Sequence, residues 1–317
     1  ELGVAGILLT RDRGYVICQN IEAPRMEKEE LLAAQGYEIK PFPWYEDQEA
    51  GLVARLGGKA VGADHGLPGT VDISAQINPL RYSLTRWEVE RYKEQGRLTA
   101  LAAEETARDI RPGDTERAVI GRLAERLWAQ GMDFIIAFCA ADERISLYRH
   151  PVATDRKIEQ RAMISVNSRR KGLIVSLTRF VQFGRVPDAL RDIYEKNVYV
   201  DCAMMSATIP GRPAIEVFRT ALDAYKEKGY PDEYRLHHQG GAIGYVGRDY
   251  KVNFETKEII CENQGFAWNP SITGTKSEDT MLATSVGPVV ISEPELFPVL
   301  LVESGGYNFR RPNILEL

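Results

Sequence analysis

Two helical patterns joined by a short turn are the feature that most limits how this chain can fold. An amphipathic pattern covers residues 87–110, and a second one ends at Ala129. Residues 111–116 break the periodicity, and Asp114 or Thr115 suits the N-cap of the second helix. Apolar side chains recur every fourth residue in that helix, at Val119, Leu123 and Leu127. The chain is therefore expected to pack two successive helices against whatever follows them.

Strand patterns follow this helix pair, so the chain mixes helices and strands. Residues 133–140 favour a buried strand, and residues 163–167 and 173–183 favour two more around a turn at Gly172. Two further helices are expected over about residues 187–207 and 213–228, with Pro213 suited to a first helical position. The last third favours strands at residues 242–246, 257–262, 280–284 and 289–292.

The first 78 residues carry a different and shorter pattern. Two apolar runs, residues 4–9 and 15–18, flank a polar turn and predict a hairpin. Residues 23–35 favour a helix that ends near Gly36, and residues 37–44 and 59–63 favour strands. We therefore expect a small α/β domain over residues 1–78 and a larger domain over residues 79–317.

Charge and hydropathy exclude several classes of protein. The chain has 45 acidic and 40 basic residues, a net charge of -5, which argues against a nucleic-acid binder. No apolar run reaches the roughly 18–20 residues of a membrane span, and no signal peptide is recognisable. The chain begins abruptly at Glu1, so we expect an upstream segment to be missing. The four cysteines are widely spaced without a C-x-x-C pair, as in a reduced, cytoplasmic protein: Cys18, Cys139, Cys202 and Cys261.

The segment richest in residues that could form a functional site is residues 236–249, which holds two histidines, four glycines and an arginine. Glycine lets the backbone approach another group closely, and histidine beside such backbone often builds a site. A turn-rich strand with hydrogen-bonded histidines is the alternative. If the segment is extended, His237 and His238 should point to opposite faces.

The order of elements and five short segments together resemble the creatinase / aminopeptidase P / prolidase family, whose fold is called pita-bread. The resemblance implies an α/β pita-bread domain over residues 79–317, preceded by the C-terminal part of a smaller α/β domain. It covers about residues 80–300 and implies, by analogy, a homodimer. The matching segments are residues 109–115, 148–151, 163–180, 237–249 and 276–280.

The family's metallopeptidases hold two divalent ions with two Asp, one His and two Glu, and this chain departs from that pattern. Two dications about 3.5–4 Å apart repel by roughly 17–19 kcal/mol at an effective dielectric constant of about 20. Four carboxylates offset this repulsion, and one carboxylate cannot. We expect no dinuclear centre and no cofactor, although His237 or His238 could reach Glu278 and hold a single ion. The matching positions carry Ser165, Ser176, Gly241, Asn269 and Glu278, of which only Glu278 keeps its type.

Within this family creatinase hydrolyses a C–N bond without metal, which makes related chemistry the leading hypothesis. The resemblance places the proton-transfer histidine at His150, with His237 and Glu278 as further catalytic candidates. The substrate is expected to be a small or peptide-like molecule, neutral or anionic because Asn269 replaces a carboxylate. The candidate substrate-binding residues are Asn269, Arg248, His238, Lys276, Trp268 and Tyr245.

Two alternative functions and three simpler residue roles remain open. The chain could be a non-catalytic relative that binds a ligand or protein, or an active proline-specific metallopeptidase, which the ligand losses argue against. Lys276 could do no more than pair with Glu278, and Trp268 could be core instead of a pocket wall. His150 could simply form a structural hydrogen bond at the end of a strand.

Overall fold

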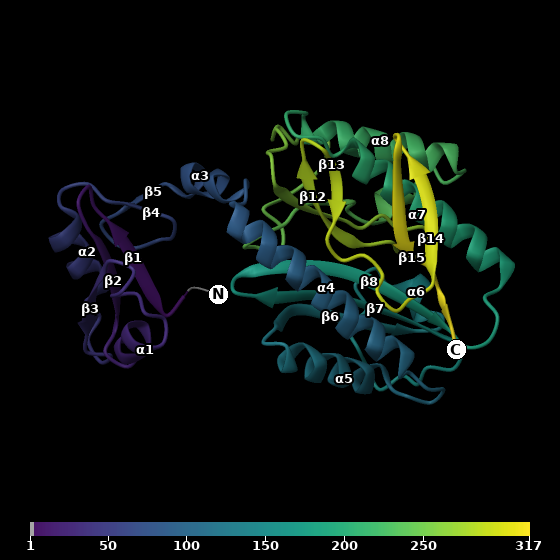
Figure 1. The fold of residues 1–317 in the computed structure, drawn as a ribbon, viewed down its shortest axis with the longest axis horizontal. Helices are drawn as coiled ribbons and strands as arrows, with labels where there is room; N and C mark the ends of the chain where they lie inside the picture. The colour runs from purple at the N-terminus through teal and green to yellow at the C-terminus, as the bar shows by residue number, and fades with distance from the viewer. Residues whose placement is uncertain (1–2) are drawn as a thin grey trace. The chain divides into compact units, whose positions relative to one another are not determined.

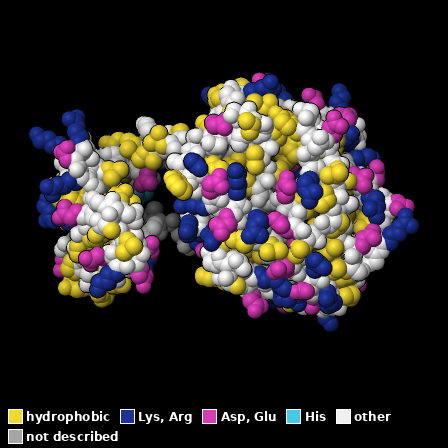
Figure 2. All heavy atoms as spheres, viewed as in Figure 1, with side chains coloured by type: hydrophobic (Ala, Val, Ile, Leu, Met, Phe, Trp, Pro, Cys, Tyr) yellow, Lys and Arg dark blue, Asp and Glu magenta, His cyan; other side chains and the backbone are white. Residues whose placement is uncertain are grey.

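The computed structural model describes residues 3–317, which divide into two compact units between Leu80 and Arg81. The division lies two residues beyond the boundary expected at residue 78. No helix among the described residues is long and apolar enough to cross a membrane. On the face of the larger unit shown in Figure 2, Lys and Arg side chains are interspersed with Asp and Glu.

The first unit is a three-stranded sheet with short helices. Strands β1 and β2 form the expected antiparallel hairpin, and β2 pairs with β3 in parallel. The helix expected over residues 23–35 ends at Lys28, because Leu31 adopts a positive φ of 54° that an α-helix cannot contain. Helix α2 was not expected. The elements are β1 (Ala5–Leu9), β2 (Gly14–Gln19), α1 (Ala23–Lys28), β3 (Tyr37–Phe42), α2 (Glu49–Gly57), β4 (Gly62–Ala63), β5 (Val71–Asp72) and α3 (Ser74–Ile77), followed by the 3-10 turn Asn78–Arg81.

The second unit begins with the expected helix pair, α4 and α5. Thr85 and Glu88 form a reciprocal capping box at the start of α4, and the Thr115 side chain caps α5. The two helices pack on one sheet, with α4 crossing β7 and β8 and α5 lying along β6 (Figure 1). The elements are α4 (Arg86–Arg108), α5 (Glu116–Ala129), β6 (Asp133–Ala141), α6 (Arg144–Leu147), β7 (Arg161–Arg170) and β8 (Leu173–Gln182).

Five of the remaining strands build a second sheet, in the order β10-β9-β11-β12-β13, which packs against α7, and α7 in turn packs against α8. Strands β14 and β15 pair with each other, and β16 joins the first sheet beside β8. Residues 257–262 form no strand, and the strand expected at residues 242–246 is instead the earlier and shorter β9. Pro213 caps α8 instead of starting it. The elements are α7 (Asp188–Ala207), α8 (Ala214–Glu227), the 3-10 helix η2 (Glu233–Leu236), β9 (Gly240–Ala242), β10 (Tyr250–Lys251), β11 (Gln264–Trp268), β12 (Asp279–Thr284), β13 (Gly287–Val290), β14 (Val299–Ser304), β15 (Tyr307–Pro312) and β16 (Leu315–Glu316).

The two sheets meet where β8 lies beside the start of β12. The backbone N–H of Thr178 donates to the carbonyl of Glu278 at 3.0 Å, and the Thr280 hydroxyl donates to the carbonyl of Ser176 at 2.9 Å. These bonds bring the β7–β8 hairpin and residues 276–280 together, although about 100 residues separate them in sequence. The candidate site lies at this junction.

Candidate functional site

The β7–β8 hairpin presents a row of small polar side chains on one face. Ser165 pairs with Thr178, and Asn167 pairs with Ser176. Because side chains alternate along a strand and paired residues share a face, all four lie on the same side of the hairpin. The two serines that the sequence resemblance places at the family's aspartate positions therefore share a face, as metal ligands would.

Glu278 lies buried against this row and is held from several directions. Its Oε2 accepts from the Thr178 hydroxyl at 2.8 Å and the Ser165 hydroxyl at 3.1 Å, and it pairs with Lys276 Nζ at 2.8 Å. Its Oε1 lies 3.5 Å from the Arg248 guanidinium. Burial alone would raise the pKa of Glu278, but Lys276 and Arg248 outweigh it and lower the pKa to about 2.

The Lys276 ammonium occupies space that a metal ion would need. Its Nζ is 2.8 Å from Glu278 and 3.2 Å from the Ser165 hydroxyl, so it contacts two of the five family ligand positions. Two fixed cations, Lys276 and Arg248, thus face one carboxylate. These two cations would repel a pair of dications, and a single carboxylate would have to offset a repulsion that four carboxylates offset in the family. The residues present therefore do not fit a dinuclear centre.

Gly241, which the sequence resemblance places at the family's metal histidine, has no room for a side chain. Strand β9 pairs with both β10 and β11, which encloses Gly241 between Lys251 and Ala267. Its φ is 158°, and a Cβ there would lie 2.0 Å from the carbonyl oxygen of Tyr250. The backbone itself therefore excludes an imidazole at this position.

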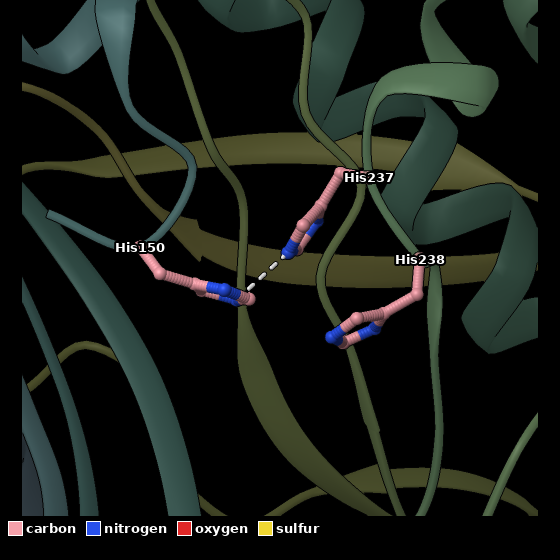
Figure 3. A group of neighbouring side chains, drawn as sticks. All are labelled: His150, His237 and His238. Atoms are coloured by element: carbon pink, nitrogen blue, oxygen red, sulfur yellow. Dashed lines mark hydrogen bonds between the residues drawn. The ribbon is translucent and has the colours of Figure 1, made fainter.

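Three histidines converge beside these groups. His150 follows α6, and His237 and His238 follow η2 (Figure 3). The His150 and His237 Nε2 atoms are 3.1 Å apart, and the His237 and His238 rings stack with centroids 4.4 Å apart. The two neighbours do not point to opposite faces as expected for an extended segment, although the His237 backbone itself is extended, with φ -156° and ψ 147°.

The electrostatic surroundings keep these imidazoles neutral. Burial, followed by the nearby charge of Lys276, lowers the pKa of His237 to about 2. Burial and the charge of Arg248 lower the pKa of His238 to about 3. Burial and Lys276 also lower the pKa of the more exposed His150, although Glu278 opposes the shift. At neutral pH each ring therefore keeps one unprotonated nitrogen.

Four groups of the site keep a buried polar atom without a hydrogen-bond partner among residues 3–317. Most buried polar atoms in proteins are satisfied, so these four atoms are available to bond a ligand or water. The atoms belong to Ser176 (Oγ), Asn269 (Oδ1), His237 (Nδ1) and Arg248 (Nε).

Two predicted substrate-binding residues lie elsewhere. Trp268 is completely buried, stacks on Phe266 and donates to the Thr208 hydroxyl at 2.9 Å, so it belongs to the core. The Tyr245 hydroxyl bonds the side chains of Glu88 and Arg91 on α4. Neither is available to a ligand held by the histidines.

Sequence reasoning missed Thr178, which bonds Glu278 directly. Its position two residues after Ser176 was the available signal, because alternate residues share a strand face. It also missed a second ionic cluster, which lies behind the site and is built around Asp279.

In this cluster, Arg179 bonds Glu104 at 2.8 Å and Asp279 at 3.0 Å. Arg311 lies 2.9 Å from Asp279 and 2.6 Å from Asp201. All five side chains are fully buried. Burial raises the pKa of Asp201 to about 6, although Arg311 opposes the shift.

Comparison with known proteins agrees with this architecture. An uncharacterized peptidase of Staphylococcus aureus (strain MW2) is 24% identical over 302 residues, which are 87% of this chain and 85% of that protein. An Xaa-Pro dipeptidase of Lactobacillus delbrueckii subsp. lactis is 24% identical over 229 residues, 68% of this chain and 61% of that protein.

Solved structures show the same fold at low sequence identity. X-Pro aminopeptidase from Thermotoga maritima MSB8 matches with a TM-score of 0.80 at 17% identity, covering 99% of this chain and 90% of that one. Xaa-Pro dipeptidase from Bacillus anthracis matches with a TM-score of 0.79 at 22% identity, covering 100% and 90%. The fold is therefore the expected pita-bread fold. Residues 90–285, more than half of the chain, match the model of Metallopeptidase family M24, and the chain belongs to that family.

Proposed function

We propose that this protein hydrolyses a C–N bond in a small molecule without a dinuclear metal centre. The observation that carries the proposal is the Lys276 ammonium, 2.8 Å from Glu278 and 3.2 Å from Ser165, where the family's metal chemistry would need a dication. Neutral imidazoles beside it supply an alternative way to activate water.

His150 is the proton carrier in this proposal. It is the most exposed of the three histidines, and its lowered pKa leaves it unprotonated at neutral pH. It takes a proton from water as the oxygen attacks the carbon, and then gives that proton to the departing nitrogen. His237, 3.1 Å away, shares a hydrogen bond that orients the His150 ring.

The charges of the site favour an anionic substrate. Lys276 and Arg248 supply two positive charges, and Glu278 supplies one negative charge that both cations already engage. Glu278 is therefore a positioning residue in this proposal, holding the two cations in place. The surplus positive charge suits a carboxylate or a similar anionic group, with Asn269 offering a buried amide.

A second candidate function is ligand binding without catalysis. Glu278 favours it, because this retained acidic group already contacts Lys276, Arg248, Ser165 and Thr178 and has little capacity left for a substrate. An active Xaa-Pro peptidase, the activity in the names of several relatives, remains a third outcome of the test.

The test is a substrate screen on EDTA-treated, dialysed protein. The panel contains N-carbamoyl, N-acyl and guanidino acids and Xaa-Pro dipeptides, with products followed by mass spectrometry. We expect turnover of an anionic substrate that survives EDTA and falls at least about 100-fold in His150→Gln. Saturable binding that His150→Gln leaves intact, without turnover, would favour the binding protein instead. Xaa-Pro turnover that requires added manganese would overturn the proposal.

A further inference from the structure

We infer that His150, His237 and His238 together bind one divalent transition-metal ion, with Zn²⁺ as the best fit. Each residue offers one ring nitrogen, and the three ligand atoms all lie within 4.8 Å of one another. None of the three occupies one of the five ligand positions of the family pattern. The inference therefore describes a separate, mononuclear site and revises the expectation that no metal binds.

The distances suit tetrahedral zinc. Zn–N bonds of about 2.0–2.1 Å at tetrahedral angles place two ligand nitrogens about 3.3 Å apart. His150 Nε2 and His237 Nε2 are already 3.1 Å apart. The nitrogen at the tip of the His238 ring points toward His150 (Figure 3), so a small shift completes the set. Three protein nitrogens leave the fourth position open.

Protonation also suits a metal. Imidazole binds metal through an unprotonated ring nitrogen, so the other nitrogen of each ring has to carry the proton. His238 Nδ1 accepts from the Gly240 N–H at 3.3 Å. When a metal binds the other ring nitrogen, the ring proton sits on Nδ1 and this long hydrogen bond is lost. His237 Nδ1 is buried without a partner among residues 3–317, so placing the ring proton on this nitrogen breaks no existing hydrogen bond.

The neighbouring cations select which ion binds. Lys276, Arg248 and Lys251 act on the histidines and repel any dication, so affinity must come from strong metal–nitrogen bonds. Zn²⁺ and Cu²⁺ form such bonds, whereas Mg²⁺ and Mn²⁺ prefer carboxylate oxygen. Glu278 is not a ligand of this site, because Lys276, Ser165 and Thr178 already hold it.

An ion here would compete with proton transfer, since both use the same lone pairs. Zn²⁺ is therefore expected to inhibit the metal-independent hydrolysis. This consequence rests on the proposed function, but metal binding itself does not.

The test uses the full chain, stripped with EDTA, and titrates Zn²⁺ by calorimetry and Co²⁺ by visible absorption. We expect one ion per chain and the intense absorption of low-coordinate Co²⁺. His238→Ala should weaken Zn²⁺ binding at least tenfold. His65→Ala removes the only remaining histidine, in the other unit, and should leave binding unchanged.

A positive variant keeps the test independent of folding defects. His238→Cys replaces the third nitrogen with a thiolate and should add a sulfur-to-cobalt charge-transfer band. The inference is overturned if unmodified protein takes up no Zn²⁺, if Co²⁺ gives only the pale spectrum of six-coordinate ion, or if His65→Ala and His238→Ala reduce binding equally. These readouts need no substrate, so failure of the proposed hydrolysis would not affect them.

Discussion

Glu278 and Asp279 are neighbours in sequence, yet they belong to two ionic clusters of opposite character. Glu278 faces two cations, Lys276 and Arg248, beside unsatisfied polar atoms and the histidines. Asp279 lies between two fully buried guanidiniums, Arg179 and Arg311. Adjacent strand residues point to opposite faces, so one chain segment serves both clusters.

The difference between the clusters lies in their charge balance. The site has two positive charges and one negative charge, whereas the interior cluster has two guanidiniums and three carboxylates, the third being Glu104 beside Asp279 and Asp201. Each interior carboxylate lies within 3.0 Å of a guanidinium. Charge proximity alone therefore does not identify a functional site. Unpartnered buried atoms do not separate the clusters either, because Asp201 Oδ1, Asp279 Oδ2 and Arg311 Nε also lack a hydrogen-bond partner among residues 3–317. The site differs in its surplus positive charge and in the three histidines beside it.

Removing one cation from each cluster should give the largest contrast. Arg311→Met leaves Asp201 buried without its ion pair, and we expect it to lower the free energy of unfolding by about 3–5 kcal/mol. Arg248→Met leaves Glu278 with Lys276, and we expect a loss of about 1–2 kcal/mol. Urea denaturation measures both variants. Equal losses would show that the two clusters are equally structural.

The two clusters should also respond to pH with opposite sign. The pKa values of His237 and His238 are lowered from about 6.5 to about 2 and about 3, so the unfolded chain binds more protons and stability falls as pH drops below about 6.5. The pKa of Asp201 is raised from 3.8 to about 6, so the folded chain binds more protons than the unfolded chain. Its contribution to stability is therefore lost as pH rises from 3.8 through about 6.

Urea denaturation between pH 4.5 and 7 separates these contributions. The double substitution His237→Gln and His238→Gln should flatten the loss of stability toward acid pH. Asp201→Asn should make that loss steeper, because the opposing contribution is gone. A steeper profile in the histidine variant would contradict the assigned pKa shifts.

Two buried serines offer the smallest and most closely matched contrast. Ser292 donates to Asp279 at 2.8 Å and accepts from the Thr280 N–H at 2.9 Å, whereas the Ser176 hydroxyl has no partner among the described residues. Ser292→Ala should cost about 1–3 kcal/mol, and Ser176→Ala should stay within about 0.5 kcal/mol. Thermal denaturation of both variants checks this. A large loss in Ser176→Ala would mean that its hydroxyl is structurally engaged.

Elements with strong local signals were predictable from sequence. Thr115 and the stripe of Val119, Leu123 and Leu127 define α5, which spans Glu116–Ala129 as expected. The β7–β8 hairpin was also expected, because its turn and flanking apolar runs are local features. Lys276 pairs with Glu278, which was one of the roles left open for it, and the two residues are only two positions apart.

Features that depend on distant contacts were not predictable. Strand β11 (Gln264–Trp268) is buried along its whole length, so it lacks the alternation that identifies a strand from sequence. Arg311 meets Asp201 across 110 residues of chain. At residues 257–262 the pattern was misleading, because Ile259 makes only an isolated bridge with Pro213. The stacking of His237 on His238 is likewise a feature of the folded chain that the local sequence pattern does not show.

The enclosure of Gly241 would make the departure from the family's metal pattern, which we infer from the sequence resemblance, hard to reverse. Restoring aspartates at Ser165 and Ser176 and a glutamate at Asn269 would still leave the histidine position closed. An imidazole there requires β10 and Tyr250 to move away from β9. Engineering a dinuclear enzyme from this chain therefore begins with rebuilding a strand pair, and single substitutions toward the family sequence lead first through less stable proteins.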